Sequence, residues 1–175
     1  QEMLKQKGMS FDGLRVSVSG SGNVAQYAVE KAMALGAKVV TVSDSSGTIV
    51  DEAGFTPEKL AILMDVKNHH YGRVSDYAAR TGVQFEAGQR PWHVPVDVAL
   101  PCATQNELDA ADARTLIANG ALCVAEGANM PSTIEAAKAF EAAGVLYAPG
   151  KASNAGGVAT SGLEMSQNAM RLSWT

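Results

Sequence analysis

The sequence lacks the features that mark nucleic-acid-binding, secreted and membrane-spanning proteins. Its 175 residues carry a formal charge of -4 and contain no run of lysines or arginines, which argues against a surface for nucleic acid or an anionic membrane. No apolar stretch approaches the ~20 residues that span a bilayer, and no signal-peptide pattern opens the chain. We therefore expect a cytoplasmic protein whose partners are small molecules.

Cysteine and histidine are also scarce. Cys102 and Cys123 lie in apolar stretches too far apart for a CxxC motif, so we expect two buried free thiols in a reducing compartment. His69, His70 and His93 show no metal-ligand spacing with an acid or a cysteine, and we expect solvated side chains and no metal site. Aromatic residues make up 6% of the chain while glycine and alanine are abundant, a balance that suits helices packed closely on a sheet.

What the sequence does contain is a regular alternation of β-branched runs and helical patterns. The expected strands are residues 14–18, 37–42, 47–51, 96–100, 122–125 and 145–148, the direction of 47–51 being undecided. The expected helices are residues 2–7, 24–35, 56–67, 75–80 and 109–119. A further helix is expected to begin at a Ser132…Glu135 capping box, and a last helical pattern runs to Thr175. Residues 89–95 are expected to form a loop. This order predicts an α/β fold, a Rossmann-like doubly wound and mostly parallel sheet with helices on both faces.

Both ends of the chain look cut. Residues 2–7 resemble the last turns of a helix stopped by Gly8, and the helical pattern at Thr175 has no cap. We expect residues 1–12 to be a helix end and linker from an upstream catalytic domain. Residues 13–175 would then be a nucleotide-binding domain that is truncated at its C-terminal end.

A glycine turn follows the first expected strand. Gly20-x-Gly22-x-x-Ala25 matches the dinucleotide-binding fingerprint, in which Gly20 permits the tight turn, Gly22 lets the backbone approach a pyrophosphate and Ala25 keeps the helix close to the strand. Such turns also occur without a cofactor. Here the strand before it, the helix after it and Asp44 at the end of the second strand favour nucleotide binding.

Asp44 leaves the choice of nucleotide open. An acid in this position usually bonds the ribose hydroxyls of NAD and repels the extra phosphate of NADP. Ser45, Lys67 and Arg73 could instead bind that phosphate, although a solvated helix end explains the two cations equally well.

Polar segments follow three later strands and contain Asn106, Asn129 and Asn154. Each amide could bond a nicotinamide carboxamide or a ribose, and we expect them at one sheet edge. Asparagine also favours turns, which is the alternative explanation for any one of them.

Five segments, in order, resemble the bacterial hexameric glutamate dehydrogenases. They span essentially the whole chain and are 16–25 (VSVSGSGNVA), 43–47 (SDSSG), 101–108 (PCATQNEL), 125–131 (AEGANMP) and 149–158 (PGKASNAGGV). The SDSSG block resembles that of NADP-specific members, which favours NADP over NAD if Asp44 turns away from the phosphate.

The resemblance implies a homohexameric enzyme that interconverts L-glutamate and 2-oxoglutarate plus ammonium with NADP(H). In this family the catalytic lysine and aspartate lie in an N-terminal domain upstream of Gln1, so the chain would hold no catalytic residue and show no turnover alone. Two alternatives stay open: a related amino-acid dehydrogenase that uses NAD, with a branched or aromatic substrate, and a non-catalytic nucleotide-sensing module.

The resemblance also assigns site residues by position. The residues expected at the cofactor are Gly20, Ser21, Gly22, Asn23, Val24, Asp44, Ser45, Lys67, Arg73, Ala103, Thr104, Asn129 and Asn154. Val158 and Ser161 would touch substrate, Ser161 through the side-chain carboxylate of glutamate, which argues against the apolar-substrate alternative.

Overall fold

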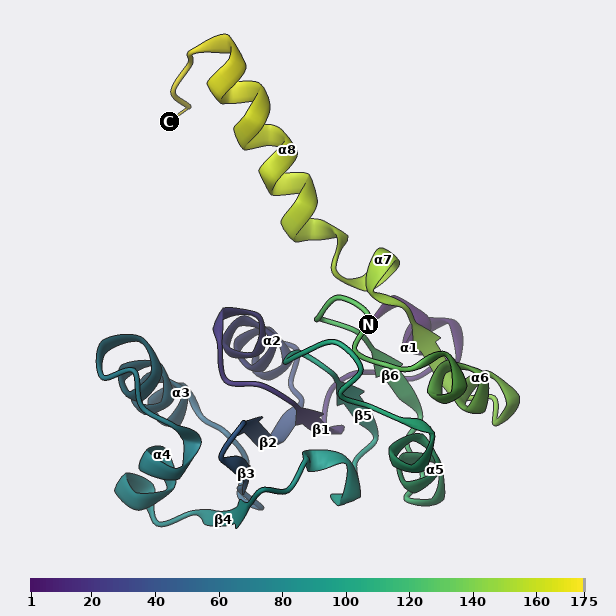
Figure 1. The fold of residues 1–175 in the computed structure, drawn as a ribbon. Helices are drawn as coiled ribbons and strands as arrows, with labels where there is room; N and C mark the ends of the chain where they lie inside the picture. The colour runs from purple at the N-terminus through teal and green to yellow at the C-terminus, as the bar shows by residue number, and fades with distance from the viewer. Residues whose placement is uncertain (175) are drawn as a thin grey trace.

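The computed structural model describes residues 1–174, which form a seven-stranded sheet with helices on both faces (Figure 1). The strands are β1 Arg15–Val18, β2 Lys38–Asp44, β3 Gly47–Val50, β4 Gln84–Ala87, β5 Val98–Leu100, β6 Cys123–Ala125 and β7 Leu146–Ala148. The helices are α1 Glu2–Gln6, α2 Asn23–Ala34, α3 Pro57–Met64, α4 Val74–Thr81, α5 Ala110–Ala118, α6 Ile134–Ala142, α7 Gly150–Ser153 and α8 Ala155–Met170, with a π-helical turn η1 Asp65–His69 and a 3-10 turn η2 Pro91–His93.

The strand order is β4-β3-β2-β1-β5-β6-β7. Strands β2, β1, β5, β6 and β7 pair in parallel, whereas β3 runs antiparallel to both β2 and β4. The predicted doubly wound, mostly parallel sheet is therefore confirmed, and β3 is the reversed strand whose direction the sequence left undecided. Because β2 and β5 flank β1, the loops after these three strands meet at one edge of the sheet.

Successive side chains of a strand point to opposite faces, and two cores result. Val39 and Val98 face the core under α1 to α4, whereas their neighbours Val40 and Ala99 face the core under α5 and α6. Burial on both faces explains why the central strands β1 and β2 are rich in valine, with the buried Ser17 and Thr41 among their residues. Figure 1 shows these two helical layers, and α8 projecting away from the sheet.

The structure differs from the sequence analysis in three places: a strand that was not predicted, a short turn within the expected loop, and the end of the last helix, which was a wrong expectation. Residues 84–87, to which the sequence analysis assigned no element, form β4, an edge strand whose side chains are half-buried or exposed. The expected loop at 89–95 contains the 3-10 turn η2. The last helix stops at Met170, where Arg171 adopts a left-handed conformation and caps it through N–H bonds to Gln167 and Asn168.

The start of α6 is a further correction. Thr133, not Ser132, is the N-cap: its hydroxyl accepts a hydrogen bond from the Ala136 N–H at 3.2 Å. Ser132 pairs with Leu108 in an isolated parallel bridge, and its N–H is directed to Glu126. The backbone of Ser132 is thus committed to the sheet side, and the helix begins one residue later.

We expect Thr133→Ala to lower the free energy of unfolding by about 1 kcal/mol, because it removes a helix cap. Ser132→Ala is the matched control, since its hydroxyl oxygen is buried without a hydrogen-bond partner and its loss should cost less. Urea unfolding of both variants measures the difference. A larger effect of Ser132→Ala would show that the cap is assigned to the wrong residue.

Candidate functional site

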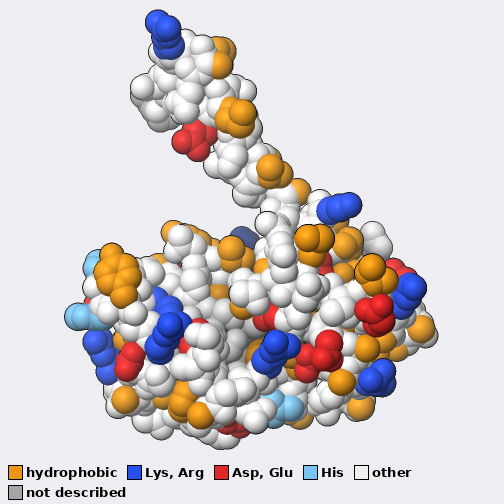
Figure 2. Space-filling model, in the orientation of Figure 1, with side chains coloured by type: hydrophobic (Ala, Val, Ile, Leu, Met, Phe, Trp, Pro, Cys, Tyr) orange, Lys and Arg blue, Asp and Glu red, His pale blue; other side chains and the backbone are white. Residues whose placement is uncertain are grey.

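Two adjoining cavities form a groove along the carboxyl edge of the strands, where a central hollow is seen in Figure 2. The β2 cavity, of about 630 Å³, is lined by Gly20, Ser21, Gly22, Asn23, Val24, Ser43, Asp44, Ser45, Lys67, Gln89, Arg90, Cys102, Ala103, Thr104 and Glu107. The α8 cavity, of about 590 Å³, is lined by Val24, Cys102, Ala103, Thr104, Gln105, Gly127, Ala128, Asn129, Asn154, Gly157 and Val158. Four residues are shared, so one elongated ligand can occupy both cavities.

The glycine turn forms the floor between the cavities. Gly20 has φ +83°, and a Cβ there would lie 2.9 Å from the Cys102 carbonyl oxygen, so both the turn and its close approach to the β5 loop require glycine. Gly22 is the N-cap of α2, and a Cβ there would meet nothing within 4 Å. The first turn of α2 therefore faces open space with its N–H groups and positive dipole end, an arrangement that suits a phosphate.

A buried carboxylate holds the β5 loop beside this turn. The Ser19 hydroxyl donates to Glu107 Oε1 at 2.8 Å and accepts from the Cys102 N–H at 2.8 Å. The Ala103 N–H donates to the same Glu107 oxygen at 3.0 Å. Burial raises the pKa of Glu107, while the bonds from Ala103 and Ser19 oppose that shift. The ends of β1 and β5 are thus joined by one network.

Asp44, at the end of β2, points into the protein. Oδ1 accepts bonds from the Ser46 N–H at 2.8 Å and the Ser46 hydroxyl at 2.6 Å. Oδ2 accepts bonds from the Val74 N–H at 3.0 Å and from Lys67 Nζ at 3.2 Å. A carboxylate has about four acceptor positions, so those of Asp44 are filled. Burial acts to raise the pKa of Asp44, but the bonds from Ser46, Val74 and Lys67 outweigh it and the pKa is lowered.

Positive side chains gather around Ser45, which is exposed at the rim of the β2 cavity. Lys67 lies in the π-helical turn η1 and uses two N–H donors, on Asp44 and on the Gly72 carbonyl at 2.8 Å. An ammonium has three donors, which leaves one for a ligand. Arg73 donates to the Ser45 hydroxyl at 2.8 Å through one of its five N–H groups, so this corner can hold a further phosphate.

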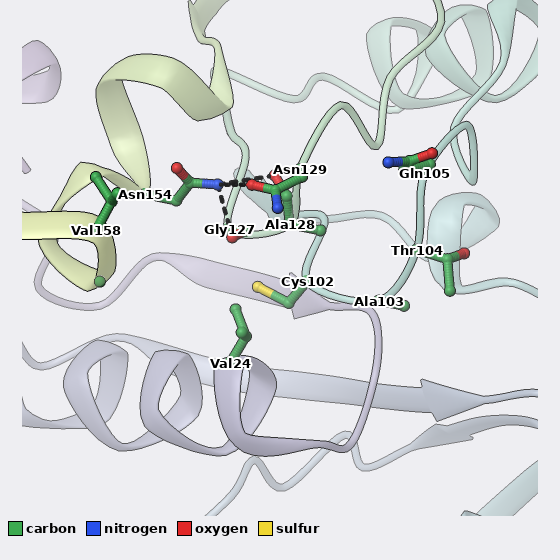
Figure 3. Close-up of a pocket in the computed structure, with 11 residues that line it drawn as sticks. Val24, Cys102, Ala103, Thr104, Gln105, Gly127, Ala128, Asn129, Asn154 and Val158 are labelled. Atoms are coloured by element: carbon green, nitrogen blue, oxygen red, sulfur yellow. Dashed lines mark hydrogen bonds between the residues drawn. The ribbon is translucent and has the colours of Figure 1, made fainter. Parts of the chain in front are cut away.

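Two neighbouring amide side chains, Asn129 and Asn154, line the α8 cavity. Asn154 Nδ2 donates to Asn129 Oδ1 at 3.0 Å and to the Ala128 carbonyl at 3.2 Å, and Figure 3 shows Val24 and Cys102 meeting below them. The Asn129 amide group thus keeps its own N–H donors for a ligand.

Glu126 is not among the residues that line this cavity, but it bonds the segment that carries Asn154. Its side chain is buried and accepts bonds from the Tyr147 hydroxyl at 2.6 Å, the Gly150 N–H at 2.7 Å and the Ser132 N–H at 3.3 Å. The Ser153 hydroxyl donates to its carbonyl. One residue thereby ties β6 to β7 and to α7, and so determines where Asn154 lies.

Comparisons with known proteins agree with this geometry. A family model described as Glutamate/Leucine/Phenylalanine/Valine dehydrogenase matches residues 1–175. The chain belongs to this dehydrogenase family.

Individual relatives narrow the comparison. An NADP-specific glutamate dehydrogenase of Salmonella typhimurium is 70% identical over 174 residues, and one of Escherichia coli is 68% identical; each match covers 99% of this chain and 39% of the relative. A crystal structure of Plasmodium falciparum glutamate dehydrogenase superposes with a TM-score of 0.93 at 46% identity, covering 99% of this chain and 38% of that one. The chain spans about 39% of the length of the curated relatives it matches.

Most residues that the family resemblance assigned to the cofactor lie in the groove. Arg73 is the exception among them, because it reaches the groove indirectly through Ser45. Val158 lines the α8 cavity, whereas Ser161 lies further along α8 and is not among the lining residues. Asn106 adopts a left-handed conformation with φ +53° and bonds the Met130 carbonyl through its N–H, so its asparagine is explained by the turn.

The sequence did not single out Gln89, Arg90, Glu107 or Glu126 as site residues. Glu107 and Glu126 lie inside segments that resembled the family, but their partners are distant in the chain and no local pattern reveals them. Gln89 and Arg90 follow the unexpected strand β4. If β4 had been recognised in the sequence, Gln89 and Arg90 would have been predicted to lie at the sheet edge.

Other sequence expectations concern side chains outside the groove. Cys102 and Cys123 are buried free thiols, as expected. His70 and His93 are about half exposed and lie 3.4 Å from Asp65 and 2.7 Å from Glu86. Within residues 1–174, no three His, Cys, Asp or Glu side chains are placed to hold a metal ion. In the same part of the chain, the helices are too short or too polar to cross a bilayer.

We expect Asp44→Asn to lower the free energy of unfolding by roughly 1–3 kcal/mol at pH 7, because N–H donors lose a charged acceptor. The pKa of Asp44 is lower in the folded protein than its ordinary value of 3.8. The contribution of the Asp44 charge to the free energy of unfolding is therefore complete above about pH 3.8. It is lost as the pH falls through the pKa that Asp44 has in the folded protein. The difference from wild type should shrink in acid.

Urea unfolding at pH 7 and at acid pH measures this dependence. Glu164→Gln, on the exposed α8, is the control for a general loss of negative charge and should show little change. A destabilisation by Asp44→Asn that is equal at every pH would show that the carboxylate charge plays no part.

Proposed function

We propose that residues 13–175 form the cofactor-binding domain of an NADP-dependent glutamate dehydrogenase, preceded by a helix end and linker in residues 1–12. The full protein interconverts L-glutamate and 2-oxoglutarate plus ammonium with NADP(H). The observation that carries this proposal is the inward-turned Asp44, whose acceptor positions are filled beside the exposed Ser45. The proposal places the protein in the cytoplasm as a homohexamer, on the strength of its family resemblance.

The state of Asp44 supports NADP over NAD. An acid that reads NAD must offer free oxygen lone pairs to the ribose hydroxyls, and those of Asp44 are occupied by protein donors. The ammonium of Lys67, whose Nζ lies 3.2 Å from Asp44 Oδ2, also compensates the negative charge of Asp44. A 2′-phosphate beside Ser45 would therefore meet a hydroxyl, an ammonium and the guanidinium of Arg73, and no free carboxylate.

The remaining groove suits the rest of the dinucleotide. The pyrophosphate would lie over Gly22 at the N-terminus of α2, and Asn129 and Asn154 would face the nicotinamide end. When bound, NADP supplies the ring that accepts or releases the hydride. We assign Val158 and Ser161 on α8 to the substrate on the open side of that ring, Ser161 through the side-chain carboxylate of glutamate.

The groove offers no activated nucleophile. Burial, followed by the nearby Glu107 charge, raises the pKa of Cys102 to about 12, so its thiol stays protonated near neutral pH. The relatives extend well beyond the matched segment. We therefore assign the catalytic lysine and aspartate to a part of the protein outside this chain.

Lys67→Ala and Arg73→Ala should weaken NADPH binding roughly 10- to 100-fold, the effect of losing a hydrogen bond to a charged group. NADH has no 2′-phosphate, and its affinity should change much less. Fluorescence titration of each variant with both nucleotides measures the two dissociation constants. Lys59→Ala is the matched control, because Lys59 pairs with Asp51 at 2.6 Å outside the groove. Unchanged NADPH affinity in Lys67→Ala would overturn the phosphate assignment.

The 175-residue chain should bind NADPH without reducing NADP in the presence of glutamate. Hydride transfer needs substrate and cofactor held together in a site from which water is excluded, and the groove is open on its α8 side. Absorbance at the wavelength of NADPH, with the full-length protein assayed in parallel, measures the rate. Glutamate-dependent reduction by the purified chain would refute the assignment of the catalytic residues to another domain.

A further inference from the structure

One wall of the β2 cavity has no role in the cofactor site described so far. Gln89 and Arg90 form it, in the segment between β4 and η2, and both are exposed. The floor is assigned to the pyrophosphate, and the corner of Ser45, Lys67 and Arg73 to the 2′-phosphate. The adenine base remains without a binding surface.

The wall is held in place from both sides. The Thr48 hydroxyl donates to the Gln89 carbonyl at 2.6 Å, which ties the segment to β3. Arg90 Nη1 donates to the Glu107 carbonyl at 2.6 Å and lies 3.8 Å from the Asp112 carboxylate. The guanidinium is therefore fixed by one edge on the β5 side of the cavity, while 57% of the Arg90 side chain stays exposed.

We propose that Arg90 and Gln89 form the adenine subsite, with the Arg90 guanidinium stacked on the face of the base. The proposal rests on the assignment of this groove to NADP. A planar guanidinium anchored by its edge presents a flat cationic face, which aromatic rings bind. The Gln89 amide carries both a donor and acceptors for the edge of the base.

The connectivity of the nucleotide agrees with this placement. Adenine is attached to the ribose carbon next to the one that carries the 2′-phosphate, so the base must leave the Ser45 corner along a neighbouring wall. Glu107 is buried and is already bonded to Ser19 and Ala103, so its carboxylate is not available to the base. Arg90 lines the cavity and bonds the carbonyl of Glu107. Figure 2 shows positive side chains beside the central hollow.

This subsite differs from the phosphate corner in what it recognises. Adenine is common to NADPH and NADH, so Arg90→Ala should weaken both by the same factor, about 3- to 30-fold for the loss of a cation–π contact. It should weaken 2′,5′-ADP, which carries only the adenosine half, to the same extent. Arg90→Lys keeps the charge but loses the plane, and should not restore full affinity.

Titration of the 175-residue chain with NADPH, NADH and 2′,5′-ADP tests the proposal, with urea unfolding as the check that each variant folds. Arg114→Ala, an exposed arginine on α5 outside the groove, is the matched control and should leave all three affinities unchanged. Lys67→Ala supplies the contrast, because it should affect NADPH and 2′,5′-ADP but not NADH.

Equal losses for all three nucleotides in Arg90→Ala, with no rescue by Arg90→Lys, would support the adenine subsite. A loss confined to NADPH and 2′,5′-ADP would make Arg90 a phosphate ligand and overturn it. Wild-type affinity in Arg90→Ala, or full rescue by Arg90→Lys, would also overturn it while leaving the proposed function intact. Failure of the wild-type chain to bind NADPH would overturn the proposed function and the subsite together.

Discussion

A carboxylate removed from water must be surrounded by hydrogen-bond donors, and this requirement fixes the loops at the carboxyl edge of the sheet. Asp44 at the end of β2, Glu107 after β5 and Glu126 after β6 each accept backbone N–H bonds, from the first residue of α4, from the β5 loop and from the first residue of α7 respectively. Loops are usually the most mobile part of a fold. Here the three carboxylates bond backbone N–H groups of segments around the groove, and these bonds hold the loops in place without a ligand.

The same requirement changes what an acid at the end of β2 can do. Asp44 draws Lys67 to within 3.2 Å and binds the first N–H of α4 through Val74. In doing so it places a cation beside Ser45 and loses its own capacity to bind a ribose. In the proposed site, a residue that would discriminate against a phosphate if it faced solvent thus supports the corner assigned to the phosphate. Under that proposal, the orientation of Asp44, and not its identity, decides between the two nucleotides.

The sequence predicted those parts of the structure that local physics determines. β-Branched runs placed the parallel strands, and the turn at Gly20 located the floor of the groove. The sequence did not predict the features that long-range contacts determine. One is β4, a half-exposed edge strand that pairs with β3. Another is the N-cap of α6, which is Thr133 because the backbone N–H of Ser132 bonds Glu126. The bond from Ser19 to Glu107 joins residues 88 positions apart, a separation that no periodicity reveals.

The β2 cavity and the α8 cavity differ in the polarity and the exposure of the side chains around them. The β2 cavity has charged and polar groups on its floor and walls, which suits the phosphates and base of a nucleotide. The α8 cavity carries apolar side chains in water: Val158 is 71% exposed and the nearby Met130 is 62% exposed. Apolar groups around a reacting centre lower the local dielectric only when a second surface covers them. Under the proposed function, the α8 cavity would therefore need a covering surface before it could serve as a reaction site, whereas the β2 cavity already has its polar lining in place.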